Sequence, residues 1–132
     1  MFQRIQSVYL ILALALSVVI CACNIHLVTD GIGAIPIIYY FSVLINIAFL
    51  VICIPQFKKR RKQMTNVFRG IIWLVIACIS GAIMFFDEKM VASAAWKTIN
   101  VIFPFISMVF SYLAWRAIAA DEKKVRDADR IR

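Results

Sequence analysis

Three residues with metal-binding side chains share one face of a predicted helix. Cys23, His26 and Asp30 stand at positions i, i+3 and i+7, and this spacing places them on one helical face. A thiolate, an imidazole and a carboxylate together could hold copper or zinc. The apolar stretch around them is expected to end before Asp30. We therefore interpret His26 as an exposed side chain at the end of that stretch, and we expect no metal and no cofactor.

Two amides, Asn46 and Asn100, interrupt long apolar stretches. A buried amide surrounded by lipid seeks a hydrogen-bond partner on a neighbouring helix. We expect both side chains to make interhelical hydrogen bonds, with contact to a polar ligand as the alternative. Pro104 should kink its helix and free a carbonyl near Asn100, which could accept a polar group from a neighbour.

Small residues spaced four apart recur in three of the apolar stretches. Such pairs let helices in lipid approach closely. They could serve the core of one chain or a dimer face. They are Ala13 with Ser17, Ala77 with Gly81, and Ser107 with Ser111.

Charged residues are missing from the middle of every apolar stretch. Proton relays and ion-coupled carriers use ionisable groups at membrane depth. Motifs of hydrolases, such as HExxH or a serine with its base, are also missing from the sequence. We expect that the protein is not an enzyme.

The elements that hold these residues are four long apolar runs. The chain has 132 residues, of which 64% are hydrophobic, and its mean hydropathy is +0.89. So much apolar surface cannot enter a core in so short a chain. Runs of about 20 residues can cross a bilayer as helices. We predict one all-α membrane domain over 1–132, an up-down-up-down bundle of four transmembrane helices at about 8–28, 35–54, 67–86 and 99–118.

Turn and breaker residues set the limits of these runs. Asp30 and Gly31 predict a turn, Pro36 opens the second run and Pro55 closes it. The connector 87–98 is expected to form a short helix at the membrane interface. The last helix should continue out of the bilayer as a cytoplasmic tail, 119–132.

The distribution of positive charge predicts the orientation. All lysines and arginines except Lys89 and Lys97 fall on one side if four spans alternate, and positive residues stay in the cytoplasm. Both termini should therefore be cytoplasmic, in a bacterial inner membrane. Tyr39, Tyr40 and Trp96 are interpreted as anchors at the outer interface.

Five consecutive positive residues lie between the second and third runs. They predict the topology, and they could also attract anionic lipid headgroups. They are Lys58, Lys59, Arg60, Arg61 and Lys62.

The tail alternates acidic and basic residues, and Glu122 with Arg126 forms an i, i+4 pair. Ile118 and Val125 lie seven apart, on nearly one face. The tail is either a solvated, self-paired helix end or a docking helix for a partner. The candidate docking residues are Gln3, Arg4, Gln6, Arg116, Asp121, Glu122, Arg126, Asp129 and Arg130.

Both ends of the chain resemble a known family. The segment 3–10 (QRIQSVYL) and the segment 121–132 (DEKKVRDADRIR) resemble the opening and the closing of the Bacteroidota membrane proteins grouped as domain of unknown function 4293. The resemblance implies four spans and an inner-membrane location, and no activity or site residue. The first outer loop is shorter than the resemblance would imply.

Two functions remain open at this level. We expect a non-enzymatic protein that binds other proteins, an assembly or accessory factor that docks a cytoplasmic or membrane partner. The alternative is a small carrier or channel for an uncharged or hydrophobic solute, alone or as a homo-oligomer, lined by Asn46, Asn100, Ser107 and Ser111. In both cases the bilayer is a partner, and nucleic acid is not.

Overall fold

The structure is a computed structural model that describes residues 2–25, 33–87 and 94–131, with side chains from residue 5 onward except that of residue 57. Its elements are the α-helices α1 (Phe2–Cys23), α3 (Ala34–Cys53), α4 (Arg60–Phe86) and α5 (Ala94–Arg130), and the 3-10 turn η1 (Ile54–Lys58). No strand occurs in these ranges. The chain is all-α, as the sequence predicts.

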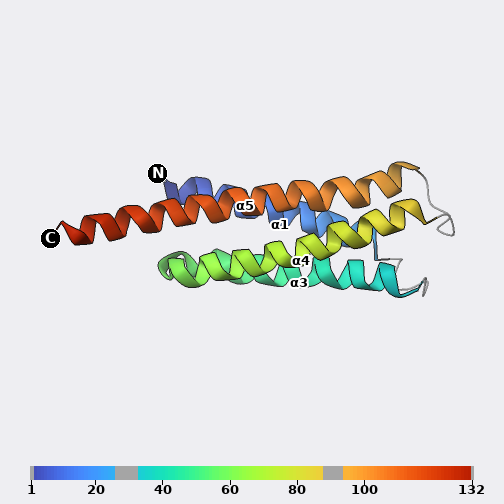
Figure 1. Cartoon of the computed structure of the whole chain (residues 1–132), viewed down its shortest axis with the longest axis horizontal. Helices are drawn as coiled ribbons and strands as arrows, with labels where there is room; N and C mark the ends of the chain where they lie inside the picture. Colours follow the sequence, from blue (N-terminus) through green and yellow to red (C-terminus); the bar gives the residue numbers. More distant parts are fainter. Residues whose placement is uncertain (1, 26–32, 88–93, 132) are drawn as a thin grey trace.

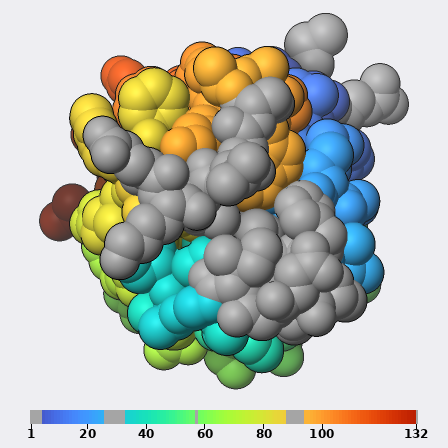
Figure 2. Space-filling view, turned by 90° about the vertical axis from the view of Figure 1, so that its right-hand side faces the viewer, coloured from blue at the N-terminus to red at the C-terminus, as the bar shows by residue number. Residues whose placement is uncertain are grey.

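The four helices close into a ring in the order α1, α3, α4, α5, and α5 packs back against α1. Neighbouring helices are antiparallel: the start of α1 lies beside the end of α5, and the end of α1 beside the start of α5 (Figure 1). Figure 2 looks at one end of this ring, where parts of all four helices surround a common centre. We call the end that holds η1 and both termini the basic end, and the other the opposite end.

All four helices are long and apolar enough to cross a membrane. The candidate spans are Ile5–Cys23, Ala34–Gln56, Arg60–Phe86 and Ala94–Arg130. Large apolar side chains face outward along them, as Ile11, Phe41 and Ile79 do. A water-soluble bundle would bury such side chains. The chain is a multi-pass membrane protein.

Two apolar clusters fill the bundle between its ends. Leu10, Leu50 and Ile118 belong to the cluster toward the basic end, whereas Ile20, Val43 and Met84 belong to the other. The small pairs found in the sequence are buried in this interior as well: Ala13, Ser17, Ala77, Gly81, Ser107 and Ser111. They serve the core of the chain itself.

The helix limits differ from the expected ones at several places. Helix α4 begins at Arg60, not near 67, because the residues between contain no helix breaker. Helix α5 begins at Ala94 and runs without interruption to Arg130, so the expected separate interfacial helix is wrong. Helix α1 ends at Cys23. Residues 26–28 of the first expected span and 88–93 of the connector lie outside the described residues.

The interpretation of Tyr39 as an interfacial anchor is also wrong. Its side chain is fully buried in the core, beside Val43 and Ala77, while the neighbouring Tyr40 is half-buried. Consecutive residues of a helix point about 100° apart, so two adjacent tyrosines cannot share one environment.

The turn between α3 and α4 is closed by paired side chains. Gln63 Nε2 donates to the Cys53 carbonyl at 3.1 Å, and Cys53 Sγ donates to the Gln63 carbonyl at 3.7 Å. Asn66 Nδ2 donates to Gln56 Oε1 at 2.9 Å. Pro55 lies at the start of η1, where the missing N–H breaks no helical bond. These contacts fix the first two turns of α4 against η1.

Candidate functional site

Buried polar side chains meet inside the bundle toward the opposite end. Asn24 Nδ2 donates to Asn100 Oδ1 at 2.9 Å and to the Ile20 carbonyl at 2.7 Å. The Tyr39 hydroxyl donates to the Asn100 carbonyl at 3.2 Å, and its distance to Asn100 Oδ1 is 3.4 Å. One residue of α5 thus ties together the C-terminal end of α1 and the start of α3.

Pro104 explains why the Asn100 carbonyl can accept this bond. A helix interior pairs each carbonyl with the N–H four residues later, and proline has no N–H. Pro104 is buried within α5, so the carbonyl of Asn100 has no partner in its own helix. Tyr39 replaces that partner from α3.

Gly81 lets α4 approach the same carbonyl. A Cβ atom placed on Gly81 would lie 2.6 Å from the Asn100 oxygen and 3.3 Å from Tyr39 Cε2. Real Cβ atoms do not come so close to a backbone oxygen. Only glycine fits where α4 crosses α5 at this depth.

A second polar group lies near the middle of the bundle. Asn46 Nδ2 donates to Ser17 Oγ at 2.9 Å, and Ser17 Oγ lies 3.0 Å from Ser107 Oγ. The Ala13 carbonyl accepts from both hydroxyls, at 2.9 Å and 3.1 Å. These bonds join α1, α3 and α5. We call the two groups together the polar seam: Ser17, Asn24, Tyr39, Asn46, Asn100 and Ser107.

Four buried polar atoms in and beside the seam have no hydrogen-bond partner among the described residues. They are Asn24 Oδ1, Asn46 Oδ1, Asn100 Nδ2 and Ser111 Oγ. Leaving such an atom unpaired in a buried site costs about 1–3 kcal/mol. A small polar molecule such as water would satisfy them.

The seam offers hydrogen bonds and no charge. Its members are amides, hydroxyls and one phenol, and Asp, Glu, Lys and Arg are missing from it. Neutral groups of this kind can orient helices or contact an uncharged solute. They cannot bind a substrate ion through opposite charge.

The polar residues of the seam recur at a fixed spacing along the sequence. Ser17 and Asn24, Tyr39 and Asn46, and Asn100 and Ser107 are each seven residues apart, so each pair shares one helical face. The sequence identifies Asn46 and Asn100 as polar contacts between helices, and both make them. It does not reveal Ser17, Asn24 or Tyr39 as their partners.

An ion pair joins α4 and α5 at the basic end. Arg60 Nη1 lies 3.2 Å from Asp121 Oδ2, with 27% and 16% of the two side chains exposed. The pair joins the start of α4 to the point at which α5 leaves the bundle. The five consecutive positive residues belong to different elements. Lys58 ends η1, and Lys59 links η1 to α4. The other three, Arg60, Arg61 and Lys62, lie in the first turn of α4.

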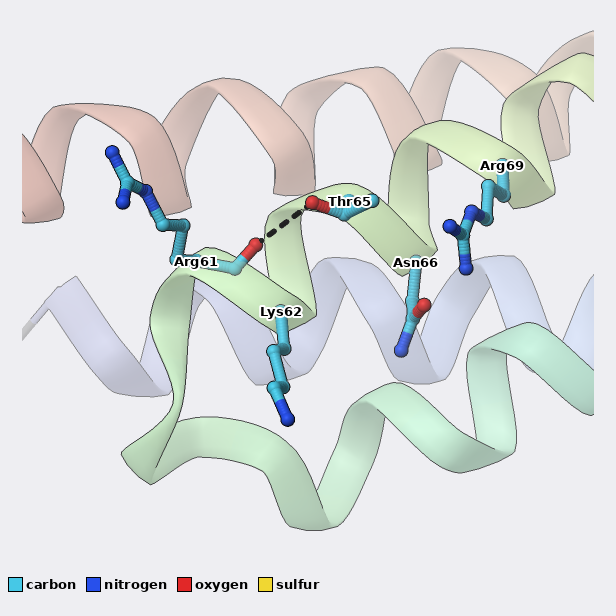
Figure 3. Close-up of a pocket in the computed structure, with 5 residues that line it drawn as sticks. All are labelled: Arg61, Lys62, Thr65, Asn66 and Arg69. Atoms are coloured by element: carbon cyan, nitrogen blue, oxygen red, sulfur yellow. Dashed lines mark hydrogen bonds between the residues drawn. The ribbon is translucent and has the colours of Figure 1, made fainter.

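A pocket of about 390 Å³ lies on the outer face of α4 at this end. Lys62, Asn66 and Arg69 project to the same side of α4 in Figure 3, whereas the Arg61 guanidinium points the other way. The remaining lining residue, Thr65, donates its hydroxyl to the Arg61 carbonyl at 3.0 Å.

The expected docking residues have different environments. Gln6 is buried and donates to the Ala117 carbonyl at 3.1 Å, so it ties α1 to α5. Arg116 is exposed on the side of α5, Asp121 and Glu122 are half-buried, and the rest of the tail is exposed, including Arg126, Asp129 and Arg130. The side chains of Gln3 and Arg4 lie outside the described residues.

The structure describes only Cys23 of the three candidate metal ligands. Cys23 is exposed at the end of α1, and His26 and Asp30 lie outside the described residues. In the part of the chain that the structure covers, no three metal-binding side chains come together.

Comparison with known proteins identifies one family. The model of the domain of unknown function DUF4293 matches residues 28–131. No curated protein and no solved structure matches the chain. The matched range includes α3, α4 and α5 with its projecting end, and with them most of the polar seam and the basic pocket. This multi-pass membrane protein therefore belongs to the DUF4293 family.

Proposed function

We propose that the protein is a non-enzymatic assembly or accessory factor of the bacterial inner membrane, and that the projecting end of α5 docks a helix of a partner protein in the cytoplasm. The observation that carries this proposal is the continuation of α5 beyond the bundle. Every residue from Lys123 to Arg130 is exposed and still helical. In Figure 1 this segment extends past the other helices.

The length of α5 supports an end that lies outside the membrane. Its 37 residues give a helix of about 55 Å at 1.5 Å per residue. A bilayer with its headgroups is about 40–45 Å thick. The excess lies on the C-terminal side, where the charges of the tail begin. The projecting segment would be only marginally stable as a helix on its own. Its helix is stabilised because it continues α5 and because the Arg60–Asp121 ion pair holds its base.

The buried face of α5 continues into the exposed segment. Spacings of four and three alternate along the buried residues of α5, as on the contact face of a coiled coil. These residues are Asn100, Pro104, Ser107, Ser111, Ala114 and Ile118. The same alternation leads on to Asp121, Val125 and Ala128. Val125 and Ala128 are exposed, so the contact face has no covering helix there.

The charges beside this face indicate the chemistry of the partner. Glu122 and Asp129 flank Val125 and Ala128 on one edge, and Lys124 lies on the other. Lys123 and Arg130 lie on the back of the helix. A partner helix with an apolar stripe and basic residues facing Glu122 and Asp129 fits this pattern, because flanking charges select partner and orientation in helix pairs.

The positive charges support the cytoplasmic location. Positive charges gather at the basic end: they belong to the block 58–62, to Arg69 and Arg116, and to the basic residues of the tail. Residues of this sign near spans remain in the cytoplasm. The basic end with both termini would therefore face the cytoplasm, where the partner helix would be met.

The experiment is cross-linked purification from native membranes of the full chain, of Val125→Glu and of Lys123→Glu. Val125→Glu places a charge on the contact face, and Lys123→Glu changes the back of the same helix. We expect one protein to be captured with the full chain and with Lys123→Glu, to be lost with Val125→Glu, and to be linked through residues 122–131. Equal capture by all three chains, or capture of the protein itself alone, would contradict the proposal.

A carrier for an uncharged solute is the second candidate, supported by the unpaired polar atoms of the interior. Asn24 Oδ1, Asn46 Oδ1 and Asn100 Nδ2 lack partners among the described residues, and a passing solute could bond to them. Flux of small polyols into vesicles that contain the protein tests this function. A flux that Asn46→Leu abolishes would favour it, and an absence of flux would remove it.

A further inference from the structure

The basic pocket on α4 has the form of a site for a phosphate group. Besides Arg61, its lining residues stand at spacings of three and four along one face of α4: Lys62, Thr65, Asn66 and Arg69. The side chains of Lys62 and Arg69 lie on either side of Asn66 in Figure 3. One N–H of the Asn66 amide is used by Gln56 Oε1, which holds the amide in place and leaves the second N–H available.

The positive charge of this pocket is not neutralised by the protein. Arg60 pairs with Asp121. Lys62 and Arg69 form no ion pair within the ranges 2–25, 33–87 and 94–131. Acidic residues are also missing from the lining. Lys62 and Arg69 are exposed beside a pocket whose lining has no carboxylate, so the pocket attracts an external anion.

The depth of the pocket places it in the headgroup layer. From Gly70 to Phe86, α4 carries no charged residue, and this stretch is about 25 Å long at 1.5 Å per residue. That length approaches the hydrocarbon thickness of a bilayer. Arg69 thus marks the edge of the hydrocarbon, and Lys62 lies about 10 Å farther out.

The same face of α4 becomes apolar directly beyond the pocket. Ile72 and Trp73 follow Arg69 by three and four residues, Ile72 exposed and Trp73 half-buried. A molecule bound here would contact cations at one end and apolar side chains at the other. A phospholipid matches this order of contacts, because it has an anionic headgroup followed by apolar chains. A soluble phosphate or a nucleic acid has no apolar chain to place there.

We propose that this pocket binds the phosphodiester group of an anionic glycerophospholipid. Lys62 and Arg69 donate to the phosphate oxygens, and Asn66 donates its second N–H to the phosphate or the glycerol. The acyl chains lie along Ile72 and Trp73. The site is independent of the proposed docking helix, because its residues belong to α4 and none of them belongs to the exposed end of α5.

The test is the binding of phosphatidylglycerol and phosphatidylcholine to the full chain in nonionic detergent, measured by native mass spectrometry. The variant Lys62→Gln/Arg69→Gln removes the two cations that flank Asn66 and keeps Arg61, the third cation of the lining, whose guanidinium points the other way (Figure 3). Lys58→Gln/Lys59→Gln is the matched control, since it removes two charges of the same block that do not line the pocket. Circular dichroism checks that each variant keeps its helices, and the single variants Lys62→Gln and Arg69→Gln replace the double one if it fails to fold.

We expect the full chain to prefer phosphatidylglycerol over phosphatidylcholine, and the pocket variant to bind phosphatidylglycerol about twentyfold more weakly, from the attraction of two positive charges near a lipid surface. The control should change binding by about twofold or less. Equal losses in the two double variants would overturn the proposal in favour of a general surface potential. Displacement of the lipid by millimolar inorganic phosphate would overturn it in favour of a soluble anion.

Discussion

The Tyr39 hydroxyl donates a hydrogen bond to the Asn100 carbonyl, 3.2 Å away. The two residues are far apart in the sequence, and the carbonyl is one that Pro104 leaves without a partner in its own helix. The proline therefore does more than remove one hydrogen bond from α5. It supplies an acceptor for another helix inside the bundle, at the depth where Gly81 lets α4 approach the backbone of α5.

Removing the phenol oxygen should weaken the bundle. Tyr39→Phe leaves the ring in the core and deletes the bond to Asn100, so we expect a loss of about 0.5–1.5 kcal/mol in the free energy of unfolding. Pro104→Ala restores an N–H to the same carbonyl. The effect of Tyr39→Phe should then be smaller in the Pro104→Ala background, as measured by a double-mutant cycle of unfolding in mixed micelles. Strictly additive effects would show that the two residues do not share this carbonyl.

Adding one methyl group should distinguish the two glycines of α4. Gly81→Ala places a Cβ 2.6 Å from a backbone oxygen, which must move, so a loss of about 1–3 kcal/mol in unfolding free energy is expected. Gly70→Ala places a Cβ 3.0 Å from Asn46 Oδ1, a side-chain atom that can shift, and in ordinary contact with Phe49 Cβ at 3.7 Å. The gain in helix propensity, about 1 kcal/mol, should offset most of the strain at Gly70. A larger loss at Gly70 than at Gly81 would contradict this packing.

Reversing the charge of Asp121 should loosen the base of the projecting helix. Asp121→Arg opposes Arg60, and we expect amide hydrogen exchange of residues 122–130 to accelerate about twofold to fivefold, as the loss of a partly exposed ion pair allows. The exchanged pair Arg60→Asp/Asp121→Arg restores opposite charges and should return the rate toward that of the original chain. Failure of the exchanged pair to slow the exchange would show that the ion pair does not hold α5.

The orientation predicts which end a membrane-impermeant thiol reagent can reach. With the native cysteines replaced by alanine, Val125→Cys should be labelled only in permeabilised cells if the basic end faces the cytoplasm, as its positive charge predicts. Ala34→Cys, exposed at the opposite end, should react when the outer membrane alone is opened. The reverse pattern would contradict the assigned orientation.

The helices could be predicted from the sequence better than their contacts. Long runs without charge have few alternatives to spanning a membrane, and α3 lies at almost the expected residues. The start of α5 is harder to predict from the sequence, because Ala94–Thr98 has no signal that distinguishes an interfacial helix from the first turn of a membrane span. DUF4293 membership follows from both the resemblance of the tail and the family match.

The hydrogen-bond partners within the polar seam could not be predicted from the sequence. Asn46 and Asn100 attract notice because amides are rare in apolar runs, yet their partners depend on which helices are neighbours and in which register. Tyr39 and Tyr40 look alike in the sequence, and only the packing of α3 against its neighbours α4 and α1 buries Tyr39. The spacing of seven between polar residues in three of the apolar runs is a further signal of the seam in the sequence.

The most direct test of the proposed docking helix is position-specific photocross-linking in living cells. A photoreactive amino acid would replace, one at a time, Val125 and Ala128 on the contact face and Lys123 and Arg130 on the back. We expect a cross-link to one and the same partner protein from Val125 and Ala128, and little or none from Lys123 and Arg130. Cross-links of equal yield from all four positions, or from the back positions alone, would contradict it.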